Sequence, residues 1–117
     1  MPPMRVSGIG LDVAEVARFR LIMGPNKKHL LYKMFSSAER KYCLSYKDAA
    51  THFAGTFAAK EAVQKAHGDF SLPLVLLEIR REKGKPAVWI GGKRMKEMLV
   101  SITHTRDLAC AIALKTS

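Results

Sequence analysis

Acidic residues are scarce in this sequence. Only 10 of its 117 residues are Asp or Glu, against 20 Lys and Arg, which gives a formal net charge of +10. Such a surface attracts anionic partners, a class that includes nucleic acids, acidic membranes and acidic proteins. Charge alone does not choose among these partners, so the positions of the few carboxylates carry the more specific information.

Cysteines and long apolar runs are also few. Cys43 and Cys110 have no second cysteine at metal-ligand spacing, so we expect two free thiols rather than a zinc site or a disulfide. The longest apolar runs, residues 74–77 and 108–114, are too short to cross a bilayer. The first residues, 1–3, do not begin a secretory signal pattern. These features favour a cytoplasmic protein with no membrane partner.

Neither internal repeats nor a linker rich in Pro, Gly and Ser interrupts the chain. About half of the residues are apolar, which suffices for a modest core. We therefore expect one domain over residues 1–117. Because so small a domain buries limited surface, association of several copies would stabilise it.

Hydrophobic periodicity predicts an α+β domain. The predicted strands cover residues 5–13, 74–81, 86–90, 100–105 and 108–114, and the predicted helices cover 13–22, 27–34, 37–44, 49–67 and 92–98. Ser36 and Glu39 fit the spacing of a capping box. Asp48 and Gly68 flank the longest helix as a predicted N-cap and terminator. This order of elements is typical of the α+β class.

The first predicted strand has one unusual face. Alternation places Gly8, Gly10 and Asp12 together with Val6 on that face. The opposite face carries Ser7, Ile9, Leu11 and Val13. Glycine leaves room for another backbone or a ligand to come close. Asp12 is then either an N-cap of the following helix or a ligand of a cation.

Glu61 lies on the apolar side of the longest predicted helix, in the same arc as Ala54 and Phe57, with Lys65 one turn later. A carboxylate there is costly to bury without a partner. Glu61 either forms an i,i+4 ion pair with Lys65 or faces a cleft and binds a cation. With Asp12, phosphate oxygens and water, it would satisfy magnesium, which prefers octahedral oxygen coordination.

Other polar residues also allow two interpretations. His104, beside a predicted hairpin turn, is either an ordinary surface histidine or a donor to a phosphate or ribose. Glu15, Arg18 and Arg20 form either a solvated helix face or a docking face for an acidic partner.

Three segments resemble the motifs of one family. Residues 8–19 (GIGLDVAEVARF) resemble its G-x-D-x-x-E-x-x-R motif, residues 57–66 (FAAKEAVQKA) its central F-A-A-K-E-A-x-x-K-A motif, and residues 101–105 (SITHT) its late S-I-S-H segment. The family is the holo-[acyl carrier protein] synthases, the small bacterial type of 4′-phosphopantetheinyl transferase. The resemblance covers essentially the whole chain, and its central motif is specific.

This resemblance implies a reaction and an assembly. The 4′-phosphopantetheine group of coenzyme A would pass to a serine of apo acyl carrier protein, leaving adenosine 3′,5′-bisphosphate. The implied fold packs an antiparallel sheet against one long helix and several short helices. The implied assembly is a homotrimer with active sites at the subunit interfaces.

The resemblance also implies roles for particular residues. Asp12 and Glu61 would hold magnesium at the pyrophosphate of coenzyme A, and Lys65 would contact phosphate, so these three form the expected catalytic group. Glu61, acting through water, is one candidate base for the serine. The residues expected at the coenzyme are Lys65, Lys60, His104 and Pro86, and those expected at the carrier's acidic helix are Arg18 and Arg20.

The sequence departs from the family pattern at a few positions. Thr56 stands where an arginine often precedes the central motif, so one expected phosphate contact is in doubt, and a nearby lysine would have to replace it. Val63, Thr103 and Leu108 replace a common phenylalanine, serine and tyrosine.

Two other classes of protein fit the sequence less well. The net charge fits a nucleic-acid-binding module, but the sequence has no aromatic motif for base stacking, zinc finger or GXXG loop. A non-catalytic assembly protein would have no use for Asp12, Glu61 and Lys65 together. We therefore expect a transferase that has no nucleic-acid partner.

Overall fold

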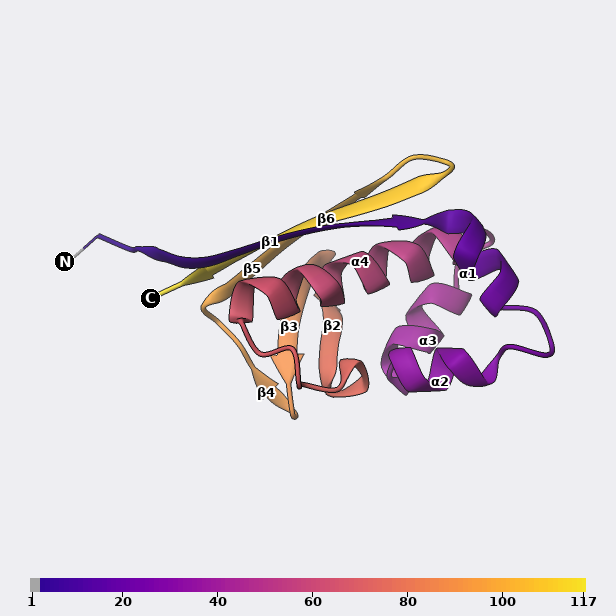
Figure 1. Cartoon of the computed structure of the whole chain (residues 1–117), viewed down its shortest axis with the longest axis horizontal. Coiled ribbons are helices and arrows are strands. Elements are labelled where there is room, and N and C mark those ends of the chain that lie inside the picture. The colour runs from indigo at the N-terminus through magenta and orange to yellow at the C-terminus, as the bar shows by residue number, and fades with distance from the viewer. Residues whose placement is uncertain (1–2) are drawn as a thin grey trace.

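Two three-stranded antiparallel sheets and one long helix form the frame of the molecule (Figure 1). The computed structural model describes residues 3–117, so the first two residues of the segment tested for a signal pattern lie outside it. In chain order the elements are β1 (Val6–Glu15), α1 (Val16–Ile22), α2 (His29–Met34), α3 (Ser37–Leu44), α4 (Ala49–His67), the 3-10 turn η1 (Leu74–Leu76), β2 (Leu77–Glu82), β3 (Lys85–Ile90), β4 (Lys93–Arg94), β5 (Met98–His104) and β6 (Leu108–Thr116). The predicted α+β class is confirmed.

The larger sheet has the order β1-β6-β5 and covers one side of α4 (Figure 1). Its face toward the helix carries small residues, among them the buried Ala109, Ala111 and Ala113 of β6. Two glycines of β1 bring the backbones closer still. A Cβ on Gly10 would lie 1.9 Å from the carbonyl oxygen of Ala62, so only glycine fits there. Close approach of strand and helix, rather than of a ligand, explains this glycine.

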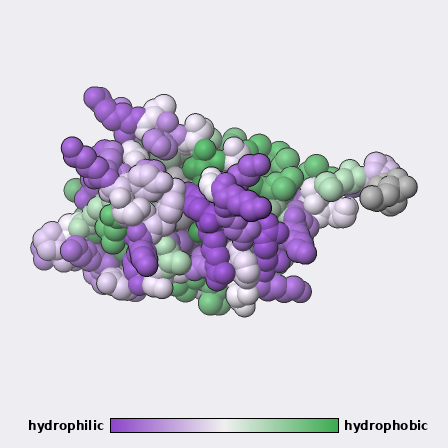
Figure 2. Space-filling view, turned by 180° about the vertical axis from the view of Figure 1, so that it is seen from behind, coloured by the Kyte–Doolittle hydropathy of each residue, from purple (hydrophilic) through white to green (hydrophobic). Residues whose placement is uncertain are grey.

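The other face of the larger sheet is apolar and exposed. Ile9, Leu11 and Val13 of β1, which the alternation predicted to share a face, are 63%, 57% and 56% exposed. Leu99 of β5 and Ile112 of β6 continue the same apolar surface. Figure 2 shows the corresponding hydrophobic area along the top of the molecule. Contiguous apolar surface of this kind marks an interaction face.

Helix α4 lies at the centre of the fold and is buried along most of its length. Its many alanines let the larger sheet, strand β2 of the smaller sheet, α1 and α3 pack closely around it. Aromatic pairs join α4 to the short helices, with ring centroids 5.4 Å apart for Phe19 and Phe57 and 5.0 Å for Phe35 and Phe53. Gly68 ends the helix in the left-handed conformation, as predicted.

The predicted helix over residues 92–98 is wrong. Gly91 and Gly92 have φ values of 58° and 82° and form a two-residue turn between β3 and β4, in which Ile90 pairs with Lys93. A Gly-Gly pair after a predicted strand is a hairpin signal, so the sequence itself indicates a turn at these residues. The first helix also begins later than predicted, at Val16, because β1 continues to Glu15.

Several further expectations have definite outcomes. The capping box of Ser36 and Glu39 is present. Cys43 and Cys110 are both free thiols. None of the helices over residues 3–117 is long and apolar enough to span a membrane.

Candidate functional site

Asp12 lies inside β1, on the face directed toward α4. Its Oδ1 atom lies 3.3 Å from Lys65 Nζ, which also donates to the carbonyl of Leu11 at 2.8 Å. The N-cap of α1 is Glu15, so the interpretation of Asp12 as a helix cap is wrong. Asp12 and Lys65 thus form a charged pair at the β1 edge of the larger sheet.

Glu61 is half-buried on the same side of α4, one turn before Lys65. Within residues 3–117, Asp12 is the only carboxylate paired with Lys65, so the i,i+4 pair with Glu61 does not form. Strand β1 and helix α4 run in opposite directions. Gly10 lies against Ala62, whereas Gly8, which comes earlier in the strand, lies against Ala66, one helical turn later. The same spacing brings Asp12 level with residues 58–62 of α4, the turn that contains Glu61.

The donors at this edge fit magnesium. Mg²⁺ is commonly bound by one or two carboxylates, and substrate phosphates and water complete its octahedron. Asp12 and Glu61 are two such carboxylates, with Asp12 only partly covered by Lys65. Over residues 3–117 no three His, Cys, Asp or Glu side chains are grouped as a metal site. A metal here would therefore depend on the substrate for several of its ligands.

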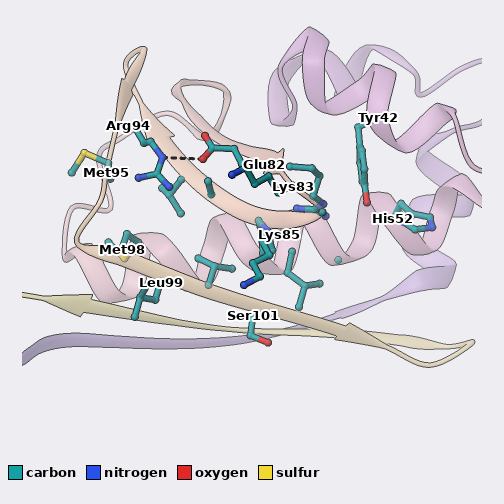
Figure 3. A pocket seen from close by; sticks show the side chains of 18 of the residues that line it. Tyr42, His52, Glu82, Lys83, Lys85, Arg94, Met95, Met98, Leu99 and Ser101 are labelled. Carbon is teal, nitrogen blue, oxygen red and sulfur yellow. Dashed lines mark hydrogen bonds and ion pairs between the residues drawn. The ribbon is translucent and has the colours of Figure 1, made fainter.

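A cleft of about 1040 Å³ lies at the opposite edge of the sheet, between β5, the β2–β3 hairpin and the first half of α4 (Figure 3). Its lining carries one carboxylate, Glu82, which Arg94 Nε approaches to 3.0 Å. The cations of the lining are Arg81, Lys83, Lys85, Arg94 and Lys96. The excess of positive charge attracts anions toward the cleft.

Pro86 and His104, two of the residues expected near the coenzyme, both line this cleft. His104 lies at the aromatic end of the cleft, with its ring centroid 5.8 Å from that of His52. The ring of His52 stacks on Tyr46, and their centroids are 3.6 Å apart. Burial and the charges of His104 and Arg81 lower the pKa of His52. Figure 3 shows Tyr42 and His52 at one end, Arg94 and Met95 at the other, and Lys85 projecting from the hairpin toward β5.

Lys60 lies in the core, away from the cleft. Its Nζ donates to Glu39 Oε1 at 2.5 Å, and both side chains are 0% exposed. Glu39 also accepts from the backbone N–H groups of Ser36 at 2.9 Å and Ile79 at 2.8 Å. Burial lowers the pKa of Lys60 and raises that of Glu39, and their mutual attraction opposes both shifts. Lys60 therefore joins α3 and β2 to α4, and its position does not support a role as a coenzyme ligand.

The two arginines expected at the carrier differ in their surroundings. Arg20 donates two hydrogen bonds to the Asp48 carboxylate, at 2.9 and 3.2 Å. Asp48 occupies the N-cap position of α4, but its side chain does not make the predicted capping hydrogen bond. Arg18 lies over the rings of Phe57 and Phe19, 4.9 and 5.6 Å from their centroids, and stays exposed. Arg18 thus has the more available charge.

Sequence reasoning missed Arg81 as a residue of the cleft. Arg81 is opposite Pro86 in the β2–β3 ladder, and side chains of directly paired residues lie on one face of a sheet. Alternation along β2 puts Arg81 in line with the buried Leu77 and Ile79. A cation in the inward row of a strand was the signal that pointed to it.

The residues expected to form one site fall into two groups. Asp12, Glu61 and Lys65 lie at the β1 edge of the larger sheet, whereas Pro86 and His104 lie in the cleft at the β5 edge, and β6 separates the edges. A single chain does not bring the two groups together.

Comparisons with known proteins agree with this architecture. Residues 8–113 match the model of the 4′-phosphopantetheinyl transferase superfamily. The chain is 35% identical to a holo-[acyl-carrier-protein] synthase of Chlamydia caviae, covering 95% of this chain and 98% of the other. It is 38% identical to that of Anaeromyxobacter dehalogenans, covering 92% of each chain.

Solved structures give the same result. The holo-(acyl-carrier-protein) synthase of Bacillus anthracis, in complex with CoA (3′,5′-ADP), superposes with a TM-score of 0.80 at 27% identity, covering 98% of this chain and 99% of the other. The holo-[acyl-carrier-protein] synthase of Helicobacter pylori, in complex with coenzyme A, superposes with a TM-score of 0.76 at 27% identity, covering 93% of this chain and 99% of the other. The chain therefore belongs to the 4′-phosphopantetheinyl transferase superfamily. It is an enzyme of that superfamily, and its resemblance to the holo-[acyl carrier protein] synthases is confirmed.

Proposed function

We propose that this enzyme transfers the 4′-phosphopantetheine group of coenzyme A to a serine of an apo acyl carrier protein, with magnesium as cofactor. The observation that carries the proposal is the pair of Lys65 and Asp12 at one sheet edge of a chain in this superfamily, with Glu61 one helical turn before Lys65. Two relatives of known structure contain coenzyme A or its 3′,5′-ADP part, and the basic cleft suits the same ligand.

In the proposed reaction the serine oxygen attacks the β-phosphorus of coenzyme A. The bond from that phosphorus to the bridging oxygen breaks, and adenosine 3′,5′-bisphosphate leaves. Such transfers depend on alignment and charge neutralisation. Lys65, held by Leu11 and Asp12, supplies a fixed positive charge. Magnesium, bound by Asp12 and Glu61, would neutralise further phosphate charge. Glu61 is the candidate base for the serine proton.

We further propose a homotrimer in which each active site lies between two copies. The carboxylate edge and the cleft edge of the sheet β1-β6-β5 are complementary halves, because one holds Asp12 and the other holds His104. A cyclic arrangement places the carboxylate edge of each copy beside the cleft edge of the next copy. The exposed apolar face of this sheet would be covered in the same assembly.

Arg18 is the proposed docking residue for the carrier, an acidic protein. Its charge is exposed and has no carboxylate within 4.0 Å over residues 3–117. Arg20 contributes less in this proposal, because Asp48 already neutralises it.

Intact-mass analysis tests the reaction. Apo carrier protein is incubated with the enzyme, coenzyme A and magnesium, and a gain of one phosphopantetheine group is expected, with none when a chelator replaces magnesium. An unchanged carrier mass with folded enzyme would contradict the proposal.

Mixing of inactive variants tests the shared site. Asp12→Ala removes one half-site and His104→Ala weakens the other, so co-refolded mixtures should be more active than either variant alone. Light scattering should give three copies per particle. An active monomer would rule out an interfacial site.

A further inference from the structure

Arg81 lines the cleft and carries an unsatisfied donor. Its Nη1 atom is buried and has no hydrogen-bond partner among residues 3–117. Buried polar atoms are nearly always paired, and a charged donor left unpaired is especially costly. This nitrogen therefore indicates a place where an acceptor from a ligand completes the structure.

The guanidinium of Arg81 is held in a defined orientation. It lies over the ring of Tyr42, with Cζ 4.5 Å from the ring centroid. Stacking fixes the guanidinium plane and leaves the N–H groups at its edge free to donate. The paired residue Pro86 lies on the same side of the hairpin and lines the same cleft. Such a planar, oriented cation suits a phosphate group.

The surroundings of Thr56 explain why an arginine on β2 is useful in this chain. Thr56 is 2% exposed, and its Oγ1 lies 3.7 Å from Cys43 Sγ. Burial raises the pKa of Cys43 to about 12, and the Thr56 hydroxyl and the charge of Arg81 oppose that shift. Arg81 lies near position 56, because it packs on Tyr42, and Cys43, the residue after Tyr42, contacts Thr56. The family motif often has an arginine at this position, and this chain has none.

The remaining question is which phosphate the cleft binds. Coenzyme A carries a pyrophosphate and a separate 3′-phosphate on its ribose. The proposed function assigns the pyrophosphate to Asp12, Glu61 and Lys65 at the other edge of the sheet. The cleft cations are then left with the 3′-phosphate.

We propose that Arg81 binds the 3′-phosphate of coenzyme A and supplies the guanidinium that Thr56 does not. Arg81 is thus a specificity residue that favours coenzyme A over its 3′-dephospho form. The inference rests on the proposed function for the identity of the ligand, and on the unpaired nitrogen for the residue.

The test compares coenzyme A with 3′-dephospho-coenzyme A in wild type and in Arg81→Gln. The substitution should raise KM for coenzyme A about 10- to 100-fold, the value of a charge-assisted hydrogen bond. KM for the dephospho form and kcat should hardly change. Arg80→Gln is the matched control, because Arg80 is the next residue of β2, is exposed on the other face and pairs with Glu78. Equal effects on both coenzymes, or none, would overturn the proposal.

A binding measurement tests the proposal without relying on turnover, so it still applies if a variant loses activity for another reason. Calorimetry with adenosine 3′,5′-bisphosphate and adenosine 5′-monophosphate should show that wild type prefers the bisphosphate. Arg81→Lys, which keeps the charge and loses the planar fork, should reduce that preference at least about fivefold. An unchanged preference in Arg81→Lys and Arg81→Gln would contradict the proposal.

These probes also separate the inference from the proposed function. A wild-type enzyme that modifies no carrier would contradict the proposed function. Comparing its preference for the bisphosphate with that of the Arg81 variants would still test the role of Arg81. Normal transfer with an Arg81-independent preference would contradict the inference alone.

Discussion

Lys60 and Lys65 lie five residues apart on α4, and each pairs with a carboxylate, but the two pairs have different surroundings. Lys60 and Glu39 are 0% exposed, and backbone donors also satisfy Glu39. Lys65 and Asp12 are 44% and 18% exposed, and Asp12 keeps acceptor capacity for a further partner. One pair is complete and stabilises the fold. The other is incomplete and is available for chemistry.

The largest expected effect is on activity at the incomplete pair. Asp12→Asn and Glu61→Gln each remove a carboxylate charge, and kcat/KM should fall at least about a thousand-fold. The midpoint of thermal unfolding should stay near the wild-type value, because neither residue is part of the core. Glu15→Gln, at the exposed end of β1, is the control and should retain activity. Full activity in either site variant would remove the distinction between the pairs.

The complete pair should respond in stability instead. Glu39→Ala leaves Lys60 buried without a counter-ion, and the free energy of unfolding in urea should fall by about 3–5 kcal/mol. The double variant Glu39→Leu with Lys60→Met should lose less than the two single variants together. Activity per folded molecule should be retained in the double variant. Additive losses would show that the pair is not coupled.

A backbone contact links the two regions. Gly10→Ala forces β1 away from Ala62, at a cost of about 1–3 kcal/mol. Asp12 should move with the strand, so activity should fall by about 100-fold as well. Gly24→Ala, in a loop far from the sheet, should cost less, since its nearest contact is 3.1 Å. Activity unaffected by Gly10→Ala would mean that the strand does not position Asp12.

Charge reversal at Arg18 should change carrier binding only. We expect Arg18→Glu to raise KM for the carrier about tenfold by repelling an acidic surface, with KM for coenzyme A unchanged. The effect should shrink as salt is added. An equal rise in both KM values would place Arg18 outside the docking surface.

The smallest expected effect concerns His52 at the cleft. Burial, with the charges of His104 and Arg81, holds its pKa below 6.5, and Asp48 opposes this weakly. The unfolded chain therefore binds the proton more readily, and stability falls as the pH drops from 6.5 through the folded-state pKa. His52→Gln should reduce this fall in urea titrations between pH 7 and 5. An unchanged pH profile would contradict this assignment.

Local signals in the sequence predicted much of the fold. The capping box at Ser36, the left-handed Gly68 and the alternation of β1 all depend on residues near one another in the chain. Alternation along β1 and helical spacing along α4 singled out Asp12, Glu61 and Lys65, and the family resemblance gave these residues their expected roles. The Gly91-Gly92 turn also has a local signal, although a helix over residues 92–98 was predicted there.

Long-range relations could not be predicted in the same way. The partner of Lys60 is 21 residues away, and nothing near Lys60 in the sequence indicates Glu39. The separation of Asp12 and His104 at opposite sheet edges follows from the strand order β1-β6-β5, which local patterns do not determine. The orientation of Arg81 on Tyr42 likewise depends on how β2 packs beside α3.

Direct measurement of metal binding tests the central claim that Asp12 and Glu61 hold one divalent ion. Manganese, used as a paramagnetic substitute for magnesium, is titrated by electron paramagnetic resonance with coenzyme A present. We predict one bound ion per chain in wild type, loss of that ion in Asp12→Asn and in Glu61→Gln, and its retention in Glu15→Gln. Unchanged manganese binding in either site variant would contradict the account.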